Sequence, residues 1–425
     1  MAIPLNRAND HLKKLLNERT IVEVNEALRP KFDKAAGGIP RGMGISPKTV
    51  NKRWEVFTEA DQAREQLLDS KTVKEMKAYQ RNIENFIGTV KVPVGIAGPL
   101  RVNGLFAQGD YYVPLATTEA ALVASYSRGA QLITKAGGAT ALLLSEGVSR
   151  APGFAFDDLR QAGLFVSWIV PQLEKLKSIA AATTRYGELI DLQITLEGNH
   201  VYLRFDYTTG DAAGQNMVTI ATQAICDYIE ENSPVQPRFF FVEANLSGDK
   251  KASAQSFMSV RGKKVTAEVI LPKQLVESTL YTTPQRMVEF WTMSAMGGVL
   301  SGTIGVQGHY ANGLAAMYIA CGQDAACVSE SAVGVTRFEL TSDEDLYCSV
   351  ILPNLIVGTV GGGTGLPSQQ ACLDLLGLAG SGGAQAFAEV AAVLSLAGEV
   401  SIIGAMCAGH FSRAHQRLAR EQAVE

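Results

Sequence analysis

The sequence has little of what marks several large classes of protein. Its 425 residues include only six cysteines and no CxxC pair, which excludes a disulfide-stapled fold and favours a reducing compartment. Charged residues make up 19% of the chain, and 38 basic against 42 acidic side chains leave a net charge of −4. Nucleic-acid binding needs a net basic surface or stripe, so we expect no nucleic-acid partner.

Long apolar runs are also lacking. No stretch reaches the ~18 uninterrupted apolar residues of a membrane span, and the best candidate, residues 386–407, is interrupted by Glu389 and Glu399. The first twenty residues show no charged-then-apolar signal pattern. We therefore expect a soluble, cytoplasmic protein with no membrane partner.

Motifs for metals and for the common nucleotide folds are missing too. Of the five histidines, His410 and His415 stand closest, but a spacing of five turns them roughly 140° apart on a helix, so we expect no metal site. There is no GxxxxGK[ST] phosphate loop, and GSGGAQ at 380–385 lacks the third glycine of a dinucleotide fingerprint. A dinucleotide would therefore bind outside a conventional Rossmann unit.

What the chain does have is apolar material for several domains. Hydrophobic residues make up 47%, and 425 residues exceed one core of ordinary size, so we expect two or three domains. Residues 1–87 show helical spacing, and residues 152–241 read as an inserted α+β unit. The flanking segments, 88–151 and 242–425, alternate strands with helices and predict one large α/β lobe. The fold class is thus a multidomain mixture of α+β and α/β.

Two glycine-rich turns are candidates for ligand binding. Residues 210–214 join a strand to a helix whose free N–H groups could meet a pyrophosphate. The run at 358–365, GTVGGGTG, offers bare backbone against which a ligand could lie. Taken alone, each is more simply interpreted as a tight turn.

Isolated polar residues in apolar settings are the remaining candidates. Glu119 follows PLATT, so we expect Thr117 or Thr118 to cap a helix that has Glu119 in its partly buried first turn. Asp324 lies in an apolar run, where a carboxylate needs a partner. Taken singly, these two and the Lys250–Lys251 pair are also explained as a helix cap, a buried hydrogen-bonded aspartate and a surface lysine pair.

Eight segments together resemble 3-hydroxy-3-methylglutaryl-coenzyme A (HMG-CoA) reductases. In chain order they are ENFIGTVKVPVGIAGPL, VPLATTEAALVAS, TGDAAGQNM, DKK, YIACGQDAA, EDLYCSVILP, GTVGGGTGLPSQQACLDLLG and AGHFSRAH. They span about 84 to 415. The DKK loop and GTVGGGT place the resemblance nearer the eukaryotic and archaeal branch (class I) than the bacterial mevalonate-degrading branch (class II).

The resemblance implies a reaction and four catalytic residues. The family reduces HMG-CoA to mevalonate and CoA with two NADPH. By the matching motifs, Lys250 stabilises the oxyanion, Glu119 supplies a proton during aldehyde reduction, and Asp324 links and tunes both. His415, rather than His410, protonates the departing CoA thiolate.

The resemblance also implies binding residues and an assembly. The expected cofactor is NADPH, with NADH left open, and the expected assembly is a homodimer or higher homo-oligomer with its active site at the interface. The large lobe is expected around a long central helix, and residues 152–241 as a ferredoxin-like NADP(H)-binding domain. The expected substrate contacts for HMG-CoA are Arg150, Asp249, Lys251 and Asn312. The expected cofactor contacts are Arg185, Asp211, Gly214, Asn216, Met217, Gly358, Thr359, Gly361, Gly362, Gly363 and Arg420.

The chain departs from the family pattern at several positions. Glu243 and Leu246 replace the usual small and aromatic residues before DKK, and Gln215 replaces a methionine in the cofactor turn. A family lysine near Thr292 is absent, and Ala414 stands where class I enzymes typically have a serine. These changes leave the acyl substrate open. The sequence as a whole also leaves the direction open, so the alternative is the same reaction run oxidatively for mevalonate breakdown.

Two alternative functions remain compatible with the sequence. One is a catalytically silent CoA- or dinucleotide-binding homologue, against which the four retained catalytic residues argue. The other is an acyltransferase that uses Cys321 or Cys327 as its nucleophile; in that case Cys321→Ser would abolish turnover.

Overall fold

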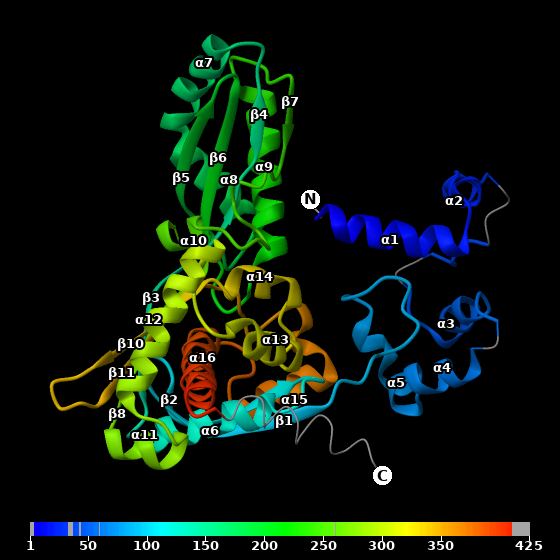
Figure 1. Ribbon diagram of the computed structural model, residues 1–425. Helices are drawn as coiled ribbons and strands as arrows, with labels where there is room; N and C mark the ends of the chain where they lie inside the picture. Colours follow the sequence, from blue (N-terminus) through cyan, green and yellow to red (C-terminus); the bar gives the residue numbers. More distant parts are fainter. Residues whose placement is uncertain (1–3, 33–36, 42–43, 59, 260, 410–425) are drawn as a thin grey trace. The chain divides into compact units, whose positions relative to one another are not determined.

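The computed structural model describes residues 4–32, 37–41, 44–58, 60–259 and 261–409 (Figure 1). The chain divides into two compact units. The first holds residues 1–76 and 83–88, and the second holds residues 77–82 and 89–425. Among the predicted site residues, His415 and Arg420 lie outside the described residues.

The first unit is helical, as its spacing predicts. In one of its helices, Ser46 and Thr49 form a reciprocal capping box and Pro47 occupies the first turn, which explains why the helix begins there. Trp54 is buried on that helix and donates from Nε1 to the carbonyl of Ile87 at 2.9 Å. The helices are α1 (Leu5–Glu18), α2 (Ile21–Leu28), α3 (Pro47–Trp54), α4 (Asp61–Leu67) and α5 (Ser70–Glu75).

The second unit mixes strands and helices. Its strands are β1 (Val94–Gly104), β2 (Gln108–Ala116), β3 (Ala139–Arg150), β4 (Gly153–Ala155), β5 (Glu188–Glu197), β6 (His200–Thr208), β7 (Phe239–Phe241), β8 (Gly262–Leu271), β9 (Gly305–Val306), β10 (Gly334–Leu340) and β11 (Leu346–Leu355). Its helices are α6 (Leu122–Lys135), α7 (Leu159–Ile169), α8 (Leu173–Thr183), α9 (Gln215–Asn232), α10 (Gln255–Met258), α11 (Lys273–Leu280), α12 (Pro284–Ser301), α13 (Tyr310–Ala320), α14 (Val328–Ser331), α15 (Pro367–Leu376) and α16 (Ala384–Cys407). Short 3₁₀ turns are η1 (Met76–Tyr79), η2 (Val170–Gln172), η3 (Ala325–Cys327) and η4 (Gly362–Gly365).

Strand β3 runs through both parts of this unit. Its residues from Thr140 to Gly147 pair antiparallel with β8, and residues 148–150 pair antiparallel with β6. The strand order is β7-β4-β6-β3-β8-β11-β10-β9, with β2 and β3 flanking β1 and with β5 beside β6. One long strand therefore connects the inserted segment to the large lobe.

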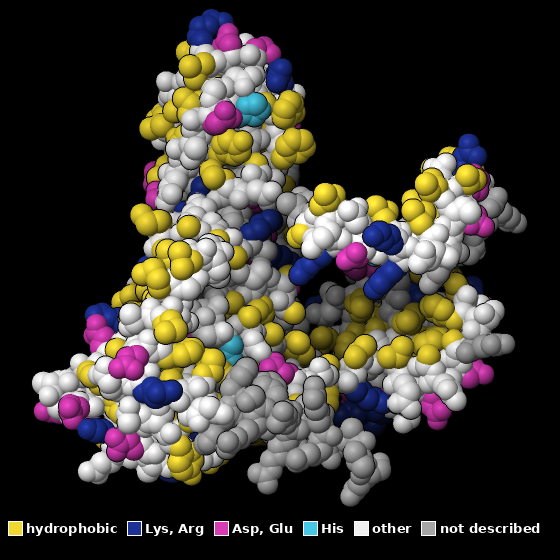
Figure 2. Space-filling view, viewed as in Figure 1, with side chains coloured by type: hydrophobic (Ala, Val, Ile, Leu, Met, Phe, Trp, Pro, Cys, Tyr) yellow, Lys and Arg dark blue, Asp and Glu magenta, His cyan; other side chains and the backbone are white. Residues whose placement is uncertain are grey.

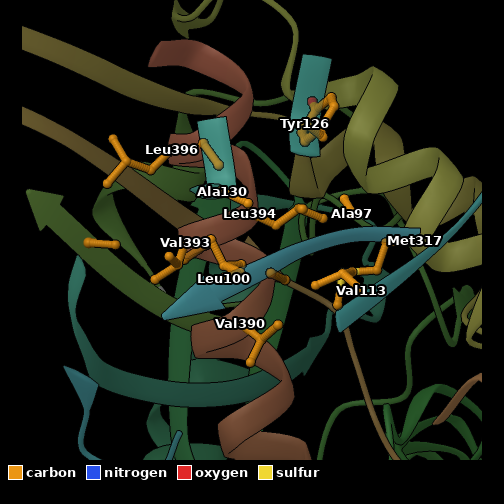
Figure 3. Close-up of a cluster of buried hydrophobic side chains, with 14 of the residues drawn as sticks. Ala97, Leu100, Val113, Tyr126, Ala130, Met317, Val390, Val393, Leu394 and Leu396 are labelled. Carbon is orange, nitrogen blue, oxygen red and sulfur yellow. The ribbon is translucent and has the colours of Figure 1, made fainter. Parts of the chain in front are cut away.

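The large lobe is built around α16, as the resemblance implies. Side chains of this helix pack against β1, β2, α6 and α13 in one buried cluster (Figure 3). By length and composition α16 qualifies as a membrane span, but 89% of its apolar window is buried inside the protein. That burial is typical of a core helix.

Both acidic residues of α16 are fully buried and satisfied by hydrogen bonds. The Glu389 carboxylate accepts from the backbone N–H groups of Leu105, Phe106 and Ala107 at 2.8 to 3.1 Å. Glu399 accepts from the N–H groups of Gly308 and His309, from the His309 ring and from the Thr336 hydroxyl. A buried carboxylate needs such partners, and here they fix the loops that precede β2 and α13.

The inserted segment has a hydrophobic cluster of its own. Phe154, Phe165, Phe205, Ile225 and other side chains of β4, β6, α7, α8 and α9 are buried there. Figure 1 shows the helices lying along the sheet formed by β4, β5 and β6. The α+β character expected of this segment is present, and its role in binding a dinucleotide stays a prediction.

Candidate active site

Lys250 and Asp324 form the ion pair at the centre of the site. Lys250 lies in the loop between β7 and α10, and its Nζ is 2.8 Å from Asp324 Oδ2. Both side chains are half-exposed, at 43% and 48%. The hydrogen bond that Lys250 donates to the Asp324 carboxylate raises the pKa of Lys250 above its usual value, so the lysine carries a full charge at neutral pH.

Backbone contacts hold the two residues in place. Lys250 has a left-handed backbone with φ of 56°, and its N–H donates to Glu330 Oε1 at 3.1 Å. Asp324 caps η3 by accepting from the Ala326 N–H at 3.0 Å. The strained conformation of Lys250 is tolerated because Glu330, which is fully buried, holds its N–H.

A buried ionic network lies directly behind the lysine loop. Arg261 donates to Glu330 at 2.8 Å and also pairs with Asp249. Arg150 pairs with Asp249 at 3.0 Å and with Glu243 at 3.3 Å. Burial works to raise the pKa of Asp249, but Arg261 and Arg150 outweigh it and hold that pKa below its usual value. Asp249 is therefore a carboxylate at neutral pH and helps to order the loop.

Two of the predicted substrate contacts, Arg150 and Asp249, are already paired within this network. Arg150 is 6% exposed, and its guanidinium is already paired with Glu243 and Asp249. Glu243 is one of the departures from the family pattern, and its carboxylate forms an ion pair with Arg150. The direct substrate contact expected of Arg150 and Asp249 stays a prediction.

Gln215, another departure, joins the cofactor turn to the same network. Its Oε1 accepts from Arg261 Nη2 at 2.9 Å and from Arg150 Nη2 at 3.2 Å, while its Nε2 has no hydrogen-bond partner among the described residues. A methionine would offer neither guanidinium an oxygen acceptor. Gln215 is thus a link between the first turn of α9 and the loop that carries Lys250.

Replacing Gln215 by methionine is expected to lower the free energy of unfolding by about 1–2 kcal/mol, because two buried guanidinium groups lose a hydrogen-bond acceptor. Urea unfolding measures the change. Gln215→Glu is the matched control: it keeps the acceptor, replaces the unpartnered amide donor by a second acceptor oxygen and adds a negative charge beside two guanidinium groups, so it should be at least as stable as the starting protein. Equal stability of the methionine variant and the starting protein would contradict this account.

Glu119 and Asn312 form a second pair. Asn312 Nδ2, in the first turn of α13, donates to Glu119 Oε2 at 2.7 Å. The predicted helix start was wrong: Thr117 does bond the N–H of Glu119 at 3.0 Å, but α6 begins only at Leu122, after Ala121 in a left-handed conformation. Glu119 therefore lies in an exposed loop rather than in a partly buried first turn.

The two pairs lie at opposite ends of α13. Asn312 is near its start and Asp324 follows its end, with about 12 Å of helix between Asn312 and Ala320 at 1.5 Å per residue. Within the described part of the chain, no hydrogen bond or ion pair links Glu119 or Asn312 to Lys250 or Asp324.

A hollow of about 510 Å³ begins at Asp324. Its walls are the turn before α9, the first turn of α9 and the glycine run after β11. Gln323 holds that run in place, because its amide both accepts from the Gly358 N–H at 2.8 Å and donates to the Gly358 carbonyl at 2.9 Å. The predicted cofactor residues that line the hollow are Gly214, Asn216, Met217, Gly358, Gly361, Gly362 and Gly363.

Three other predicted cofactor residues are placed differently. The Asp211 carboxylate accepts from the N–H groups of Gly382 and Ala384, at the start of α16. Thr359 is buried and donates to the Gly380 carbonyl at 2.6 Å. Arg185 is exposed in the loop before β5, next to Thr184, whose hydroxyl contacts the Met217 sulfur at 3.0 Å. Asp211 and Thr359 shape the walls here, while contact with a cofactor stays a prediction for all three.

Arg81 and Asn82 also line the hollow, and reasoning from the sequence missed both. They precede the nearest cofactor motif by about 130 residues and fall in a stretch that was interpreted as a helical appendage. The signal that could have found Asn82 is its place two residues before ENFIG, the first matching segment. Lys251, by contrast, is exposed and makes no side-chain hydrogen bond to a described residue.

The buried cysteines do not suit nucleophilic catalysis. Burial raises the pKa of Cys327 to about 12 and raises that of Cys321 further. Both thiols therefore stay protonated at neutral pH, whereas the thiolate is the nucleophile. Among the described residues, no group of three or more His, Cys, Asp and Glu side chains is arranged to hold a metal ion.

Comparison with known proteins decides the family. The family model for hydroxymethylglutaryl-coenzyme A reductase matches residues 49–420. The chain belongs to this family. Among curated HMG-CoA reductases, that of Pyrococcus horikoshii is 44% identical over 80% of this chain and 84% of its own length. That of Aeropyrum pernix is 46% identical over 80% and 82%.

More distant HMG-CoA reductases show how far the likeness extends. HMG-CoA reductase 1 of Dictyostelium discoideum is 34% identical over 95% of this chain and 73% of its own length. A solved class II HMG-CoA reductase from Streptococcus pneumoniae, bound to NADPH in open conformations, has a TM-score of 0.64 at 21% identity, covering 82% of this chain and 85% of that one. At that identity the solved structure supports the fold.

Proposed function

We propose that the chain catalyses the reduction of HMG-CoA to mevalonate and CoA with two equivalents of NADPH. The observation that carries the proposal is the Lys250–Asp324 ion pair at the edge of a hollow walled by the glycine run and the first turn of α9. A cation held by an ion pair beside a hollow of about 510 Å³ suits hydride transfer to a carbonyl. Membership of the HMG-CoA reductase family supplies the substrate class.

Lys250 acts in both reduction steps. Each hydride addition places negative charge on a carbonyl oxygen, and the charged Nζ stabilises that charge where it develops. Asp324 keeps the lysine protonated and directed, since its hydrogen bond raises the lysine pKa. NADPH, when bound, supplies the two hydrides. The residues that would hold it are the first turn of α9, with its free N–H groups, and the glycine run.

The proton transfers belong to Glu119 and His415. In the first step the thioester carbon gains a hydride, the C–S bond breaks, and a proton from His415 goes to the departing CoA sulfur. In the second step the aldehyde carbon gains a hydride, and a proton from Glu119 goes to the alkoxide oxygen. Asn312 orients the carboxyl group of Glu119, which is protonated before this step, through the 2.7 Å hydrogen bond to Oε2.

We infer that the working enzyme is a homodimer or a higher homo-oligomer. The two pairs lie at opposite ends of α13 in one chain, so a site that uses all of these residues draws them from two chains. Helix α12 supports this: Met293, Met296, Val299 and Leu300 are 59% to 82% exposed on it, and Figure 2 shows apolar side chains gathered over that helix. Such a stripe is typical of a surface that a partner covers.

The cofactor preference and the cellular context complete the proposal. Arg185 is the cation expected to favour NADPH over NADH, because the 2′-phosphate carries additional negative charge. We place the protein in the cytoplasm and nearer class I. The 44% to 46% identity to archaeal relatives, against 21% to the class II structure, supports that class.

Absorbance assays test the activity. HMG-CoA with NADPH should cause oxidation of the cofactor, and HMG-CoA with NADH should cause slower oxidation. Mevalonate, CoA and oxidised cofactor then measure the reverse reaction, which resolves the preferred direction. Binding of NADPH and HMG-CoA without any turnover would instead favour the silent homologue.

A further inference from the structure

The hollow beside Asp324 has an uneven charge distribution. Of the described residues that line it, Arg81 is the one Lys or Arg side chain and Asp324 is the one carboxylate. Arg81 is exposed, and it makes no hydrogen bond or ion pair to a described residue. One end of the hollow thus holds the predicted catalytic pair, and a cation without a protein partner stands elsewhere on its wall.

The neighbour of Arg81 fixes this cation beside the glycine run. Asn82 Nδ2 donates to the carbonyl of Gly362 at 2.8 Å, across 280 positions of sequence. Two turn hydrogen bonds, from Gln80 N–H to the Lys77 carbonyl and from Asn82 N–H to the Tyr79 carbonyl, order the segment locally. Arg81 is therefore held at the wall of the hollow by its own short segment.

The first turn of α9 supplies a second set of hydrogen-bond donors for an anion. Its N-cap is Gly214, in a left-handed conformation with φ of 73° and no side-chain cap. The residues that follow, Gln215 to Met217, line the hollow, and their N–H groups have no intrahelical partner. Free N–H groups and a nearby guanidinium together suit a group with two negative charges, such as a pyrophosphate.

We propose that Arg81 binds the pyrophosphate of the dinucleotide, a cofactor-binding role that rests on the proposed function. The 2′-phosphate has a different expected partner. Arg185 lies in the loop that contacts α9 through Thr184 and Met217, and it is not among the residues that line the hollow. Arg81 lines the hollow itself, and its neighbour Asn82 contacts Gly362. NADPH and NADH share the pyrophosphate, so Arg81 binds both alike.

Direct binding tests the proposal without any need for turnover. NADPH and NADH are titrated separately into the full-length protein, and the fluorescence of the reduced nicotinamide is followed. Arg81→Ala is expected to raise the Kd for both dinucleotides by a similar factor of about ten, as for loss of one charged hydrogen-bond partner. Arg81→Lys keeps the positive charge but loses the paired N–H donors of the guanidinium group. Its Kd values should therefore lie between those of the starting protein and those of Arg81→Ala. Arg185→Ala should weaken NADPH binding and leave NADH binding almost unchanged.

Lys77→Ala is the matched control. Lys77 is an exposed cation in the same segment, four residues earlier, and it does not line the hollow, so its removal should leave both Kd values unchanged. Unchanged binding in Arg81→Ala would overturn the proposal, and so would a loss confined to NADPH, which would assign Arg81 to the 2′-phosphate. Equal losses of dinucleotide affinity in Arg81→Ala and Lys77→Ala would show an effect of general surface charge. That result would also overturn the proposal. The proposed reductase activity is tested separately. A protein that binds both dinucleotides but does not oxidise NADPH with HMG-CoA would contradict the proposed function and would leave the Arg81 site unaffected.

Discussion

Lys250→Ala is expected to abolish reduction of HMG-CoA and, equally, reduction of free mevaldehyde, the aldehyde between the two steps. Both steps build negative charge on a carbonyl oxygen that only a fixed cation at this position stabilises. Loss of one oxyanion donor costs on the order of 10²–10³ in rate, and loss of a full charge should cost at least that. Because Lys250 is half-exposed and its structural contact is made by its backbone N–H, the variant should still fold.

His415→Gln is the contrasting variant. His415 acts when the CoA thiolate leaves, since a thiolate with a pKa near ~8.5 in the free state departs faster once it is protonated. Mevaldehyde has no thiolate to lose. The variant should therefore lose thioester reduction and keep much of its mevaldehyde reduction. Steady-state kinetics of both variants on both substrates, with folding checked by circular dichroism, measure the difference. A His415→Gln variant as inactive on mevaldehyde as Lys250→Ala would show that the roles are assigned wrongly.

Two inactive variants are expected to restore each other's activity when they share a dimer. Glu119→Gln and Lys250→Ala should each be inactive alone. If one site takes Glu119 from one chain and Lys250 from its partner, then a mixed dimer has one intact site and one doubly altered site. Mixed dimers, purified through two different affinity tags, should therefore show about half of the normal activity per dimer.

The controls for this experiment are the two homodimers, carried through the same purification. A mixed dimer without activity would place Glu119 and Lys250 of each site in one chain. It would also mean that Glu119 moves across the length of α13 to reach the lysine, since Asn312 and Asp324 lie at its two ends. A fully active monomer in size-exclusion chromatography with light scattering would contradict the assembly altogether.

The sequence predicted those features of the fold and the site that depend on a short stretch of residues. The apolar run with Glu389 and Glu399 is a helix buried in the core, and backbone donors from other elements satisfy both carboxylates. The glycine turns before α9 and after β11 meet at one hollow, and ligand binding by them stays a prediction. Asp324 has the partner that was expected of it, Lys250, but the aspartate is half-exposed rather than buried, because the apolar helix α13 ends before it.

Contacts between distant residues were beyond local patterns. The Thr117 hydroxyl accepts from the N–H of Glu119, as an N-cap residue would, but no helix follows directly. Helix α6 begins only at Leu122, with Ala121 as its N-cap. Asn82 was not found because its partner, Gly362, is 280 positions away. Nor does any local pattern bring Arg150, Gln215 and Arg261 together, since three separate elements converge to form that network. Such contacts depend on the topology of the sheet, which no short window contains.

The most direct measurement of the central claim is the stoichiometry of the complete reaction. HMG-CoA is supplied as the limiting reagent with excess NADPH, and NADPH oxidation, free thiol and mevalonate are measured in the same sample. Two equivalents of NADPH consumed for each CoA and each mevalonate released are the result expected from Lys250 acting in both hydride transfers. One equivalent per CoA, with the aldehyde accumulating, or CoA release without NADPH oxidation, would contradict the account.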